Sequence, residues 1–361
     1  MGATSYPVGD ANAVQRWAAS FAQEPEKKMA LLKYMGSGEN ACIVVLRDLE
    51  KGAGEKIVVP LFMKMTGDGV EGDNIIEDTT AEEALVTFND SLFIDQRRKG
   101  TKTKGKMSEQ RVLYNMRDRG KTQLASWFGE DYDAQLIMYL SGARGVDTTL
   151  HVPVGWRGRA SNALTAPDPA HIIYGGDATA KATIDAADIM SIAVIDKIVA
   201  KIETIDPIMM PIDVGQGENK HLCLMHPFAA FDLRKSVSNN DWVDIHKMAD
   251  GKDNLIYQNA LGEHNGIVLA KHRNVIRFSD YGSGEVTPAS RALVLGAQSG
   301  MIAWGGSAKG VNRYSWNEET YDRGNGLAIT IGAIYGCKGS EFNSKWYGRI
   351  ALDTYAIDPN A

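Results

Sequence analysis

Cysteine is scarce in this sequence. Only three cysteines occur among the 361 residues, namely Cys42, Cys223 and Cys337, and they are far apart with no C-x-x-C pair. A disulfide framework needs an even set of thiols and a zinc ribbon needs closely spaced ligands, so the pattern argues against both. A reducing compartment is the default for such a chain.

Long hydrophobic runs are also missing. No apolar run approaches the roughly 20 residues that a membrane-spanning helix needs. The N-terminus has no charged segment followed by an apolar one, which a signal peptide requires. It begins "MGATSY", but Tyr6 stands where a myristoylation signal needs Ser or Thr. We expect a soluble protein, made in the cytoplasm, that does not bind membranes.

The chain also lacks an excess of positive charge. Lys and Arg number 39 against 45 Asp and Glu, a formal net charge of -6. A protein that wraps nucleic acid needs surplus cations at the phosphates, so this balance argues against such a role without excluding a protein that encloses nucleic acid. Hydrophobic residues make up 44% of the chain, enough for a sizeable core.

The sequence lacks the motifs of nucleophilic catalysis, G-x-S-x-G and S-x-x-K, and the zinc motif H-E-x-x-H. His221 and His226 are five residues apart, but a zinc site needs three or four convergent ligands. An oligomeric metal-dependent hydrolase, built on these histidines and an acidic loop, is one alternative. The missing catalytic set argues against it, and we expect no enzymatic activity and no cofactor.

The acidic loop is "MTGDGVEGDNIIEDTT", residues 65–80. The strand-like segments "EKIVVPLFMKM" and "EALVTFNDSLFIDQRR" flank it, so it is predicted to be the tip of a long two-stranded hairpin. The carboxylates do not have EF-hand spacing, and that loop needs flanking helices. A solvated tip is the preferred interpretation, and a loosely held cation among the carboxylates stays open.

Upstream, "ACIVVLRDLEKGAGEKIVVPLFMKM" has two β-branched runs around a glycine turn and predicts another hairpin. Short helical segments are predicted over residues 14–21 and 28–34. Downstream, "QRRKGTKTKGK" carries six cations. This run is interpreted as a solvated loop, and contact with an acidic neighbour or a DNA-filled interior is the alternative.

Residues 108–141 change to a three- and four-residue apolar period, which indicates one long amphipathic helix. Ser108 is the expected N-cap, and Gly129 allows a bend or break. If continuous, the helix is about 50 Å long. A helix of that length after a long hairpin indicates an extended subunit rather than a compact enzyme domain.

The rest of the chain predicts an α+β class. A second helix follows Asp185 and Asp188, which resemble a capping pair, and ends before Pro207. "KHLCLMHPFAAFDLRKSV" predicts a strand that leads into a helix with Pro227 in its first turn. From "GIVLAKHRNVIRF" onward the pattern is mostly strand.

Six segments, in order from about residue 42 to residue 356, carry a family resemblance. They are "TGDGVEGDNIIED", "FNDSLFIDQRR", "KMSEQRVLYNMRDRGKTQLASWF", "ALGEHNGIVLAKHRNV", "ALVLGAQSGMIAWGG" and "GLAITIGAIYGCKGSEFNSKWYGRIALDTYA". Together they resemble the major capsid proteins of tailed phages, and among them the family typified by the major capsid protein of coliphage N-four.

The resemblance implies the capsid fold named for phage Hong Kong 97. It implies an N-terminal arm (1–54), an extended β-hairpin loop (55–105), a peripheral domain with a long spine helix (106–182), an axial domain (183–305) and a return to the peripheral domain (306–361).

The implied function is a major capsid protein that assembles with itself into pentamers and hexamers of an icosahedral shell. Such a shell encloses the double-stranded DNA of a tailed bacteriophage without sequence-specific binding. The virion is the expected location, after assembly in the host cytoplasm, with scaffolding, portal and decoration proteins as further partners. An encapsulin-like nanocompartment shell is the nearest alternative.

Candidate contact residues between subunits follow from this assignment. They are the carboxylates at the hairpin tip, two arginines at its base and three arginines on the exposed face of the spine helix. In order, these residues are Asp68, Glu71, Asp73, Arg97, Arg98, Arg111, Arg117 and Arg119.

Overall fold

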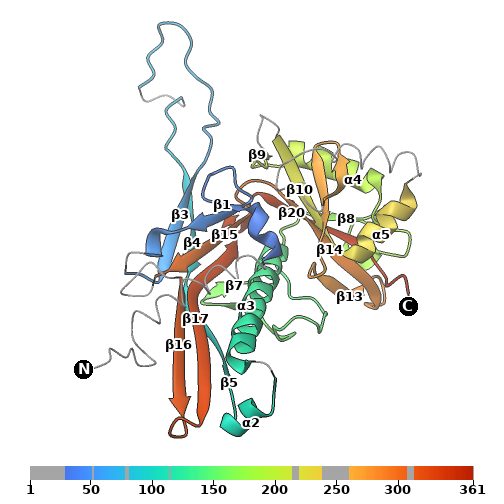
Figure 1. Cartoon of the computed structure of the whole chain (residues 1–361). Coiled ribbons are helices and arrows are strands. Elements are labelled where there is room, and N and C mark those ends of the chain that lie inside the picture. The colour runs from blue at the N-terminus through green and yellow to red at the C-terminus, as the bar shows by residue number, and fades with distance from the viewer. Residues whose placement is uncertain are drawn as a thin grey trace.

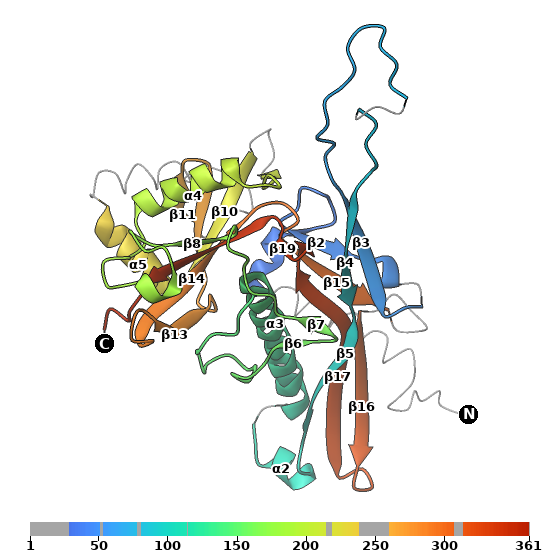
Figure 2. The same ribbon diagram turned by 180° about the vertical axis from the view of Figure 1, so that it is seen from behind.

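The computed structural model describes residues 29–50, 53–77, 81–113, 115–213, 219–237, 260–306 and 313–360. These ranges contain both helices and strands, which confirms the predicted α+β class. Figures 1 and 2 show a long hairpin projecting at the top, one sheet running down to the bottom, and a second sheet with helices to the side. The helix predicted over residues 14–21 lies outside the described residues.

The first sheet has six strands. In space β1, β2, β15, β17 and β16 follow one another, and β5 also pairs with β17. The strands are β1 (Met35–Gly36), β2 (Ile43–Leu46), β5 (Asp95–Lys102), β15 (Gly300–Gly305), β16 (Tyr314–Tyr321) and β17 (Gly326–Gly339).

The hairpin predicted around "EKGAGEK" is wrong. β2 pairs in parallel with β15, whose residues lie more than 250 positions later in the chain, and not with the strand that follows it. A β-branched run shows that a strand forms, but its partner is set by which apolar faces bury each other. Ile43 on β2 is fully buried in the main core.

The second predicted hairpin is confirmed. β3 (Lys56–Phe62) and β4 (Thr87–Phe93) form an antiparallel two-stranded ladder with the acidic stretch beyond it. We call residues 55–94 the hairpin arm and residues 65–83 the arm tip. β4 continues into β5 with only Ile94 between them, so one extended segment pairs first with β3 and then with β17.

The spine helix is α3 (Met116–Ser141), and it begins later than predicted. The Asn115 side chain caps it by accepting hydrogen bonds from two main-chain N–H groups of the first turn. Ser108 lies instead in the separate short helix α2 (Lys106–Gln110). The 26 residues of α3 span ~39 Å at the usual rise.

No break occurs at Gly129. α3 runs through this residue because its second half is buried almost completely, from Asp131 to Ser141. Tertiary packing therefore outweighs the weak helix propensity of glycine. At the last turn, Arg349 is fully buried and donates from Nη1 to the carbonyl of Leu140 at 2.9 Å.

The second sheet has eight strands, with the order β11, β12, β10, β14, β20, β8, while β13 pairs with β14 and β9 with β10. The strands are β8 (Ile172–Tyr174), β9 (Ile212–Asp213), β10 (Asn219–Met225), β11 (Ala260–His264), β12 (Ile267–Lys271), β13 (Arg277–Tyr281), β14 (Thr287–Leu295) and β20 (Arg349–Tyr355).

Both faces of this sheet are covered. Along β10, Leu222 and Leu224 point into the core shared with α3, whereas Cys223 and Met225 point into a second core. Helices α4 (Ile192–Thr204) and α5 (Pro227–Ser236) supply the second core. Strands covered on both faces are apolar without alternation, which explains runs such as "LCLM".

The sequence predicted the start of α5 correctly and the start of α4 wrongly. α5 has Pro227 at its first position, as predicted, and the His226 side chain accepts from the Phe228 N–H. α4 begins after Ser191, so the proposed capping pair is wrong. Asp188 instead closes a turn before the helix by accepting from the main-chain N–H of Asp185 at 2.8 Å.

Short elements complete the chain. They are the 3₁₀ helices η1 (Ala30–Tyr34), η2 (Asp48–Glu50) and η3 (Lys181–Thr183) and the strand pairs β6 (Gly158–Arg159) with β7 (Asn162–Ala163) and β18 (Glu341–Phe342) with β19 (Lys345–Trp346). None of the helices in the described ranges combines the length and apolar character needed to cross a membrane.

Candidate functional site

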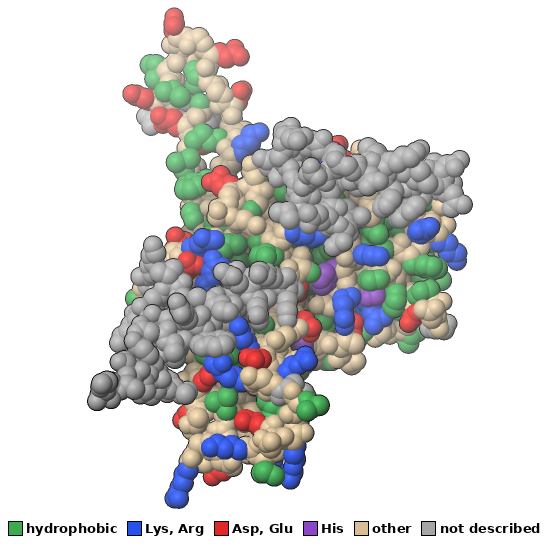
Figure 3. Space-filling view, viewed as in Figure 1, with side chains coloured by type: hydrophobic (Ala, Val, Ile, Leu, Met, Phe, Trp, Pro, Cys, Tyr) green, Lys and Arg blue, Asp and Glu red, His purple; other side chains and the backbone are tan. Residues whose placement is uncertain are grey.

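The hairpin arm exposes large apolar side chains. Alternate residues of β3 face solvent, because no other described part of the chain forms a layer over that face of its ladder with β4. The exposed side chains are Val58, Phe62, Met65, Ile75, Ile76, Leu85 and Val86, from 52% to 74% exposed. Figure 3 shows apolar and acidic side chains together on this projection. Contiguous exposed apolar surface marks an interaction site.

The candidate carboxylates at the arm tip are all exposed. The side chain of Asp68 accepts from its neighbour, the Gly69 N–H, at 3.0 Å. Glu71 and Asp73 project from the same loop. Among the described residues no group of three His, Cys, Asp or Glu side chains is placed to hold a metal ion.

The base of the hairpin arm is fixed to the body. Asp90 is buried, pairs with the Lys338 ammonium and also accepts from a main-chain N–H of β18. The Asn162 amide bonds both main-chain groups of Phe93, at 3.0 and 2.8 Å. A Cβ on Gly336 would lie 1.9 Å from the Phe93 carbonyl oxygen, so only glycine fits where the arm crosses β17.

Arg97, one of the two arginines predicted at the base of the arm, makes an ion pair within the chain. Its Nη2 lies 2.6 Å from Oδ1 of Asp131, a fully buried carboxylate on α3. Burial lowers the pKa of Arg97, but the charge of Asp131, its hydrogen bond and the nearby Tyr335 and Tyr132 together raise it further, so the guanidinium stays charged. Gln135 and Tyr335 also donate to Asp131, at 2.7 and 3.0 Å. Arg98, on the other face of β5, is exposed.

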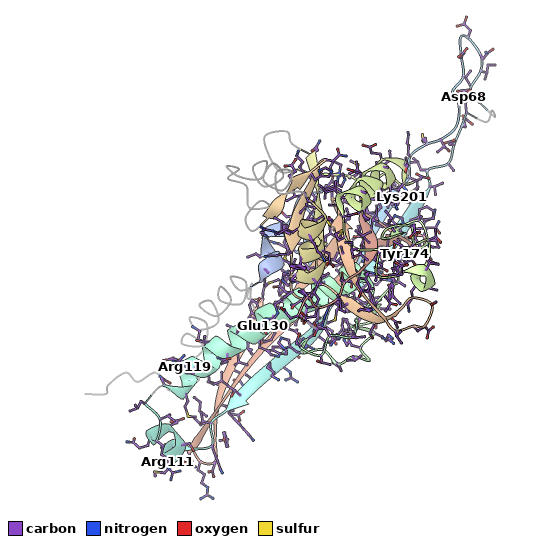
Figure 4. The ribbon with its side chains drawn as sticks, turned by 90° about the vertical axis from the view of Figure 1, so that its right-hand side faces the viewer. Asp68, Arg111, Arg119, Glu130, Tyr174 and Lys201 are labelled. Atoms are coloured by element: carbon purple, nitrogen blue, oxygen red, sulfur yellow. The ribbon has the colours of Figure 1, made fainter. Side chains whose placement is uncertain are left out.

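The three remaining arginines differ in position. Arg117 binds Glu318 of β16 through Nε and Nη2, and Trp316 donates to the same carboxylate at 2.9 Å. Arg111 is not on the spine helix as predicted, because the chain turns after α2 and Arg111 is the residue at that turn. Arg119 is exposed on α3, and Figure 4 shows it with Glu130 along the helix.

A cleft of about 550 Å³ lies between the first half of α3 and the strands β5 and β17. We call it the α3–β5 cleft. Its lining combines cations with apolar side chains and includes Lys99, Lys102, Met116, Arg119, Gln123, Leu124, Trp127, Glu130, His151, Leu327 and Ile329.

Trp127 is the central side chain of this cleft. The Arg97 guanidinium lies 5.1 Å and the Lys99 ammonium 5.2 Å from its ring centroid, within the range of cation–π attraction. The His151 ring stacks on the indole at 5.9 Å, and its Nε2 is 3.5 Å from Glu130. No sequence pattern predicts this cleft, because its parts lie far apart in the sequence.

The histidines of the hydrolase alternative have other contacts. Nε2 of His221 is 3.4 Å from the Met209 carbonyl oxygen, and His226 caps α5. Burial, helped for His226 by nearby Arg277, lowers the pKa of both, for His226 to about 4. Cys42, Cys223 and Cys337 are free and buried, and burial raises the pKa of each thiol to about 12.

A projecting hairpin arm, a long spine helix and two sheets of this topology define a class, the shell-forming subunits with the Hong Kong 97-type capsid fold. Solved capsids of phages share the fold. The capsid of Ralstonia phage GP4 is 36% identical with a TM-score of 0.86, and all of both chains is covered. The capsid of Cyanophage Pam1 is 22% identical with a TM-score of 0.72, covering 91% of this chain and 93% of that one.

The chain belongs to the phage capsid protein family, whose model matches residues 5–357. The major capsid protein of Pseudomonas phage KPP25 is 24% identical, covering 91% of this chain and 89% of that protein. The protein is therefore a shell subunit of a bacteriophage virion, and the family supports neither the nanocompartment nor the hydrolase. The narrower resemblance to the coliphage N-four family is compatible with these matches and stays a prediction.

Proposed function

We propose that this chain is the major capsid protein of a tailed phage and that many copies form pentamers and hexamers of an icosahedral shell around double-stranded DNA. The observation that carries the proposal is the hairpin arm. It holds seven large apolar side chains away from the body on a base fixed by Asp90 and Asn162. Such a projection has no function in a monomer, but it can contact a neighbouring copy.

The domain division follows the two sheets. We propose that the six-stranded sheet with α3 forms the peripheral domain and that the eight-stranded sheet with α4 and α5 forms the axial domain. β20 then returns from the end of the chain into the eight-stranded sheet, between β14 and β8. The predicted boundary at 54 falls between β2 and its partner β15. The predicted boundary at 305 falls between β15 and its partner β17.

Shell stability would come from many repeated contacts. Burying one large apolar side chain contributes about 1.5–3 kcal/mol, so the seven on the hairpin arm contribute on the order of 10 kcal/mol per contact before the cost of association. Each copy both gives and receives an arm, so these contacts multiply within a closed shell.

The remaining proposals concern partners. The chain acts as a structural subunit without catalysis or a cofactor, and it encloses DNA without reading its sequence. The net charge of -6 supports weak rather than tight DNA binding by the shell as a whole. Scaffolding, portal and decoration proteins are proposed partners, with assembly in the host cytoplasm.

The test is assembly of the purified protein, followed by sedimentation and negative-stain microscopy. We expect closed shells, or rings of five and six, from the wild type. Phe62→Asp and Leu85→Asp should lower the shell yield by at least about tenfold, because each removes more than 1.4 kcal/mol from every repeated contact. Val286→Asp, a 77% exposed position between β13 and β14, is the control.

Two results would contradict the proposal. One is a wild type that stays a homogeneous monomer or dimer under crowding and with scaffold. The other is normal shells from both hairpin-arm variants, which would leave shell formation standing but remove the arm as its basis.

A further inference from the structure

Lys and Arg are concentrated in two segments that lie beside the spine helix. Residues 97–121, which comprise β5, α2 and the start of α3, carry ten Lys and Arg and two Asp and Glu. Residues 271–277, which join β12 to β13, add three Lys and Arg and no carboxylate. The arm tip, residues 65–83, carries seven Asp and Glu and no Lys or Arg. A chain of net charge -6 therefore holds a strongly positive region of its own.

Two clefts connect the basic segments along α3. The first is the α3–β5 cleft. The second has a volume of about 200 Å³ and lies between α3 and the loops at residues 149–151 and 272–274. Glu130 and His151 line both clefts, so the two are continuous. We call them together the α3 trough.

Exposed cations stand at both ends of the α3 trough. Lys99 of β5 and Arg119 of α3 line the first cleft, and Arg273 lines the second. All three residues are exposed. The Lys99 ammonium is 5.2 Å from the ring centroid of Trp127, which places it over the trough. In the described part of the chain neither Lys99 nor Arg273 pairs with a carboxylate.

The other ionisable groups of the trough already have partners. The Glu130 carboxylate is 3.5 Å from Nε2 of His151, and Asp133 accepts from two main-chain N–H groups of η1. His272 is uncharged near neutral pH, because burial lowers its pKa to about 4 with help from two nearby cations. The trough therefore has Lys and Arg side chains to offer, and they suit an anionic partner.

The trough is long enough for several phosphates. Its lining residues on α3 run from Met116 to Ala134, ~27 Å at the usual rise. Each strand of a DNA duplex carries one phosphate per ~3.4 Å, so about eight per strand lie over this length. The long Lys and Arg side chains on the rims reach such phosphates while every base stays stacked.

Two other anionic partners fit less well. Single-stranded nucleic acid needs open aromatic rings on which its bases stack, but Trp127 already contacts Arg97, Lys99 and His151. An acidic protein segment is the second candidate. Of these polyanions, duplex DNA is the one that the proposed function places against every copy of the chain.

We propose that the α3 trough faces the enclosed DNA and that Lys99, Arg119 and Arg273 bind its phosphates. This inference rests on the proposed function and names the DNA-facing surface. Three phosphate contacts per copy bind weakly and read no sequence, but many copies share one DNA molecule, so their effects add. Helices α4 and α5 cover the opposite face of the eight-stranded sheet from α3. In Figure 4, Lys201 of α4 lies far from Arg119 and Glu130.

Salt dependence tests the contacts. Fluorescence anisotropy would measure binding of the unassembled subunit to a short labelled DNA duplex between about 50 and 200 mM salt. Three contacts predict a slope of about -2.7 in the logarithm of affinity against the logarithm of salt concentration. Lys99→Gln with Arg273→Gln should bring the slope about two units closer to zero and weaken binding at least about tenfold at low salt. A second duplex of unrelated sequence should give the same losses.

The control is Lys201→Gln with Lys235→Gln, which makes the same change in net charge on α4 and α5. It should keep the slope of the wild type. Both double variants should form shells at the wild-type yield, because the contact is with DNA and not between copies. Far-ultraviolet circular dichroism and urea unfolding of the unassembled subunits should show that both fold.

Three outcomes would overturn the inference. An unchanged slope in the trough variant means that Lys99 and Arg273 touch no phosphate. Equal losses in the control mean that DNA responds to the net charge of the subunit and not to this surface. Normal DNA binding with lost shells in the trough variant assigns the trough to a protein partner. A wild type that forms no shells contradicts the proposed function instead, and the slopes of the unassembled subunits still decide where DNA binds.

Discussion

At the scale of single residues, buried polar groups determine how segments distant in sequence are held together. Asp133 is one of these groups. It lies on α3 at 4% exposure and accepts from the main-chain N–H groups of Ala30 and Leu31, at 2.7 and 3.1 Å. The first described segment of the chain is thus held on the spine helix by one carboxylate.

Asp133 should make the stability of the subunit depend on pH. Burial raises its pKa to about 6, although the hydrogen bonds from Ala30 and Leu31 lower it in part. The folded state then holds a proton that the unfolded chain has released, so the contribution of Asp133 to stability is present in full below about pH 4 and is lost as the pH rises to about 6. Asp133→Asn should remove this loss, which amounts to about 2–3 kcal/mol.

Urea unfolding of the unassembled subunit between pH 4 and 7 measures the effect. Asp118→Asn, an exposed carboxylate in the first turn of the same helix, should leave the wild-type slope unchanged. If the unfolding free energies of the wild type and Asp133→Asn change with pH in the same way, the carboxylate does not keep its proton in the folded state.

Some single-residue features were open to prediction and others were not. Pro227 at the start of α5 follows from its fixed φ and missing N–H, which are local properties. The roles of Arg97 and Arg349 are not local. Their partners, Asp131 and the last carbonyl groups of α3, come into reach only when the sheets close around the helix. Both arginines therefore resemble exposed cations in the sequence.

At the scale of elements, the joint between hairpin arm and body is the most constrained place. Gly336→Ala should disturb this joint, because the new Cβ would meet the Phe93 carbonyl oxygen. This oxygen is a backbone atom, so it cannot move aside by a change of side-chain rotamer. We expect a loss of about 1–3 kcal/mol in unfolding free energy. Shell yield should fall as well, since the arm would leave the body at a different angle.

Gly332→Ala in the same strand is a matched comparison. Its Cβ would press on the side chains of Ser315 and Arg98, at 2.8 and 2.9 Å, and both can move. It should lose less stability and assemble normally in the same sedimentation assay. Equal yields from the two variants would mean that the crossing at Phe93 does not set the position of the arm.

Elements were predicted well where one segment carries its own signal. The hairpin arm, β17 and the strand leading into α5 each follow from an apolar run between turn residues. The partner of β2 and the start of α3 were predicted wrongly. Strand pairing depends on distant faces, and Asn115, a good N-cap inside an apparently periodic stretch, competes with Ser108.

At the scale of the whole molecule, folding and assembly should be separable. No residue of the arm tip belongs to a hydrophobic core cluster of the described chain. Replacing residues 65–84 by Asn-Gly should therefore close β3 and β4 as a short hairpin and leave the subunit folded. The shortened protein should form no closed shells.

Thermal unfolding and sedimentation of the shortened protein check both parts. A midpoint close to that of the wild type, with sedimentation as a small species, is the expected pair of results. Closed shells from this protein would show that the contacts of the body alone are sufficient. Unfolding at a much lower temperature would show that the arm tip contributes to the fold.

The passage of β4 into β5 has a mechanical consequence. A neighbour that pulls on the hairpin arm pulls along the strand direction of β5, which is registered with β17 at eight positions. When the load runs at right angles to the hydrogen bonds of a ladder, all of the bonds share it. When the load opens a ladder from one end, its bonds break one after another. Tension from an expanding interior would therefore spread across a whole ladder, and a shell joined through such segments should stretch before it tears.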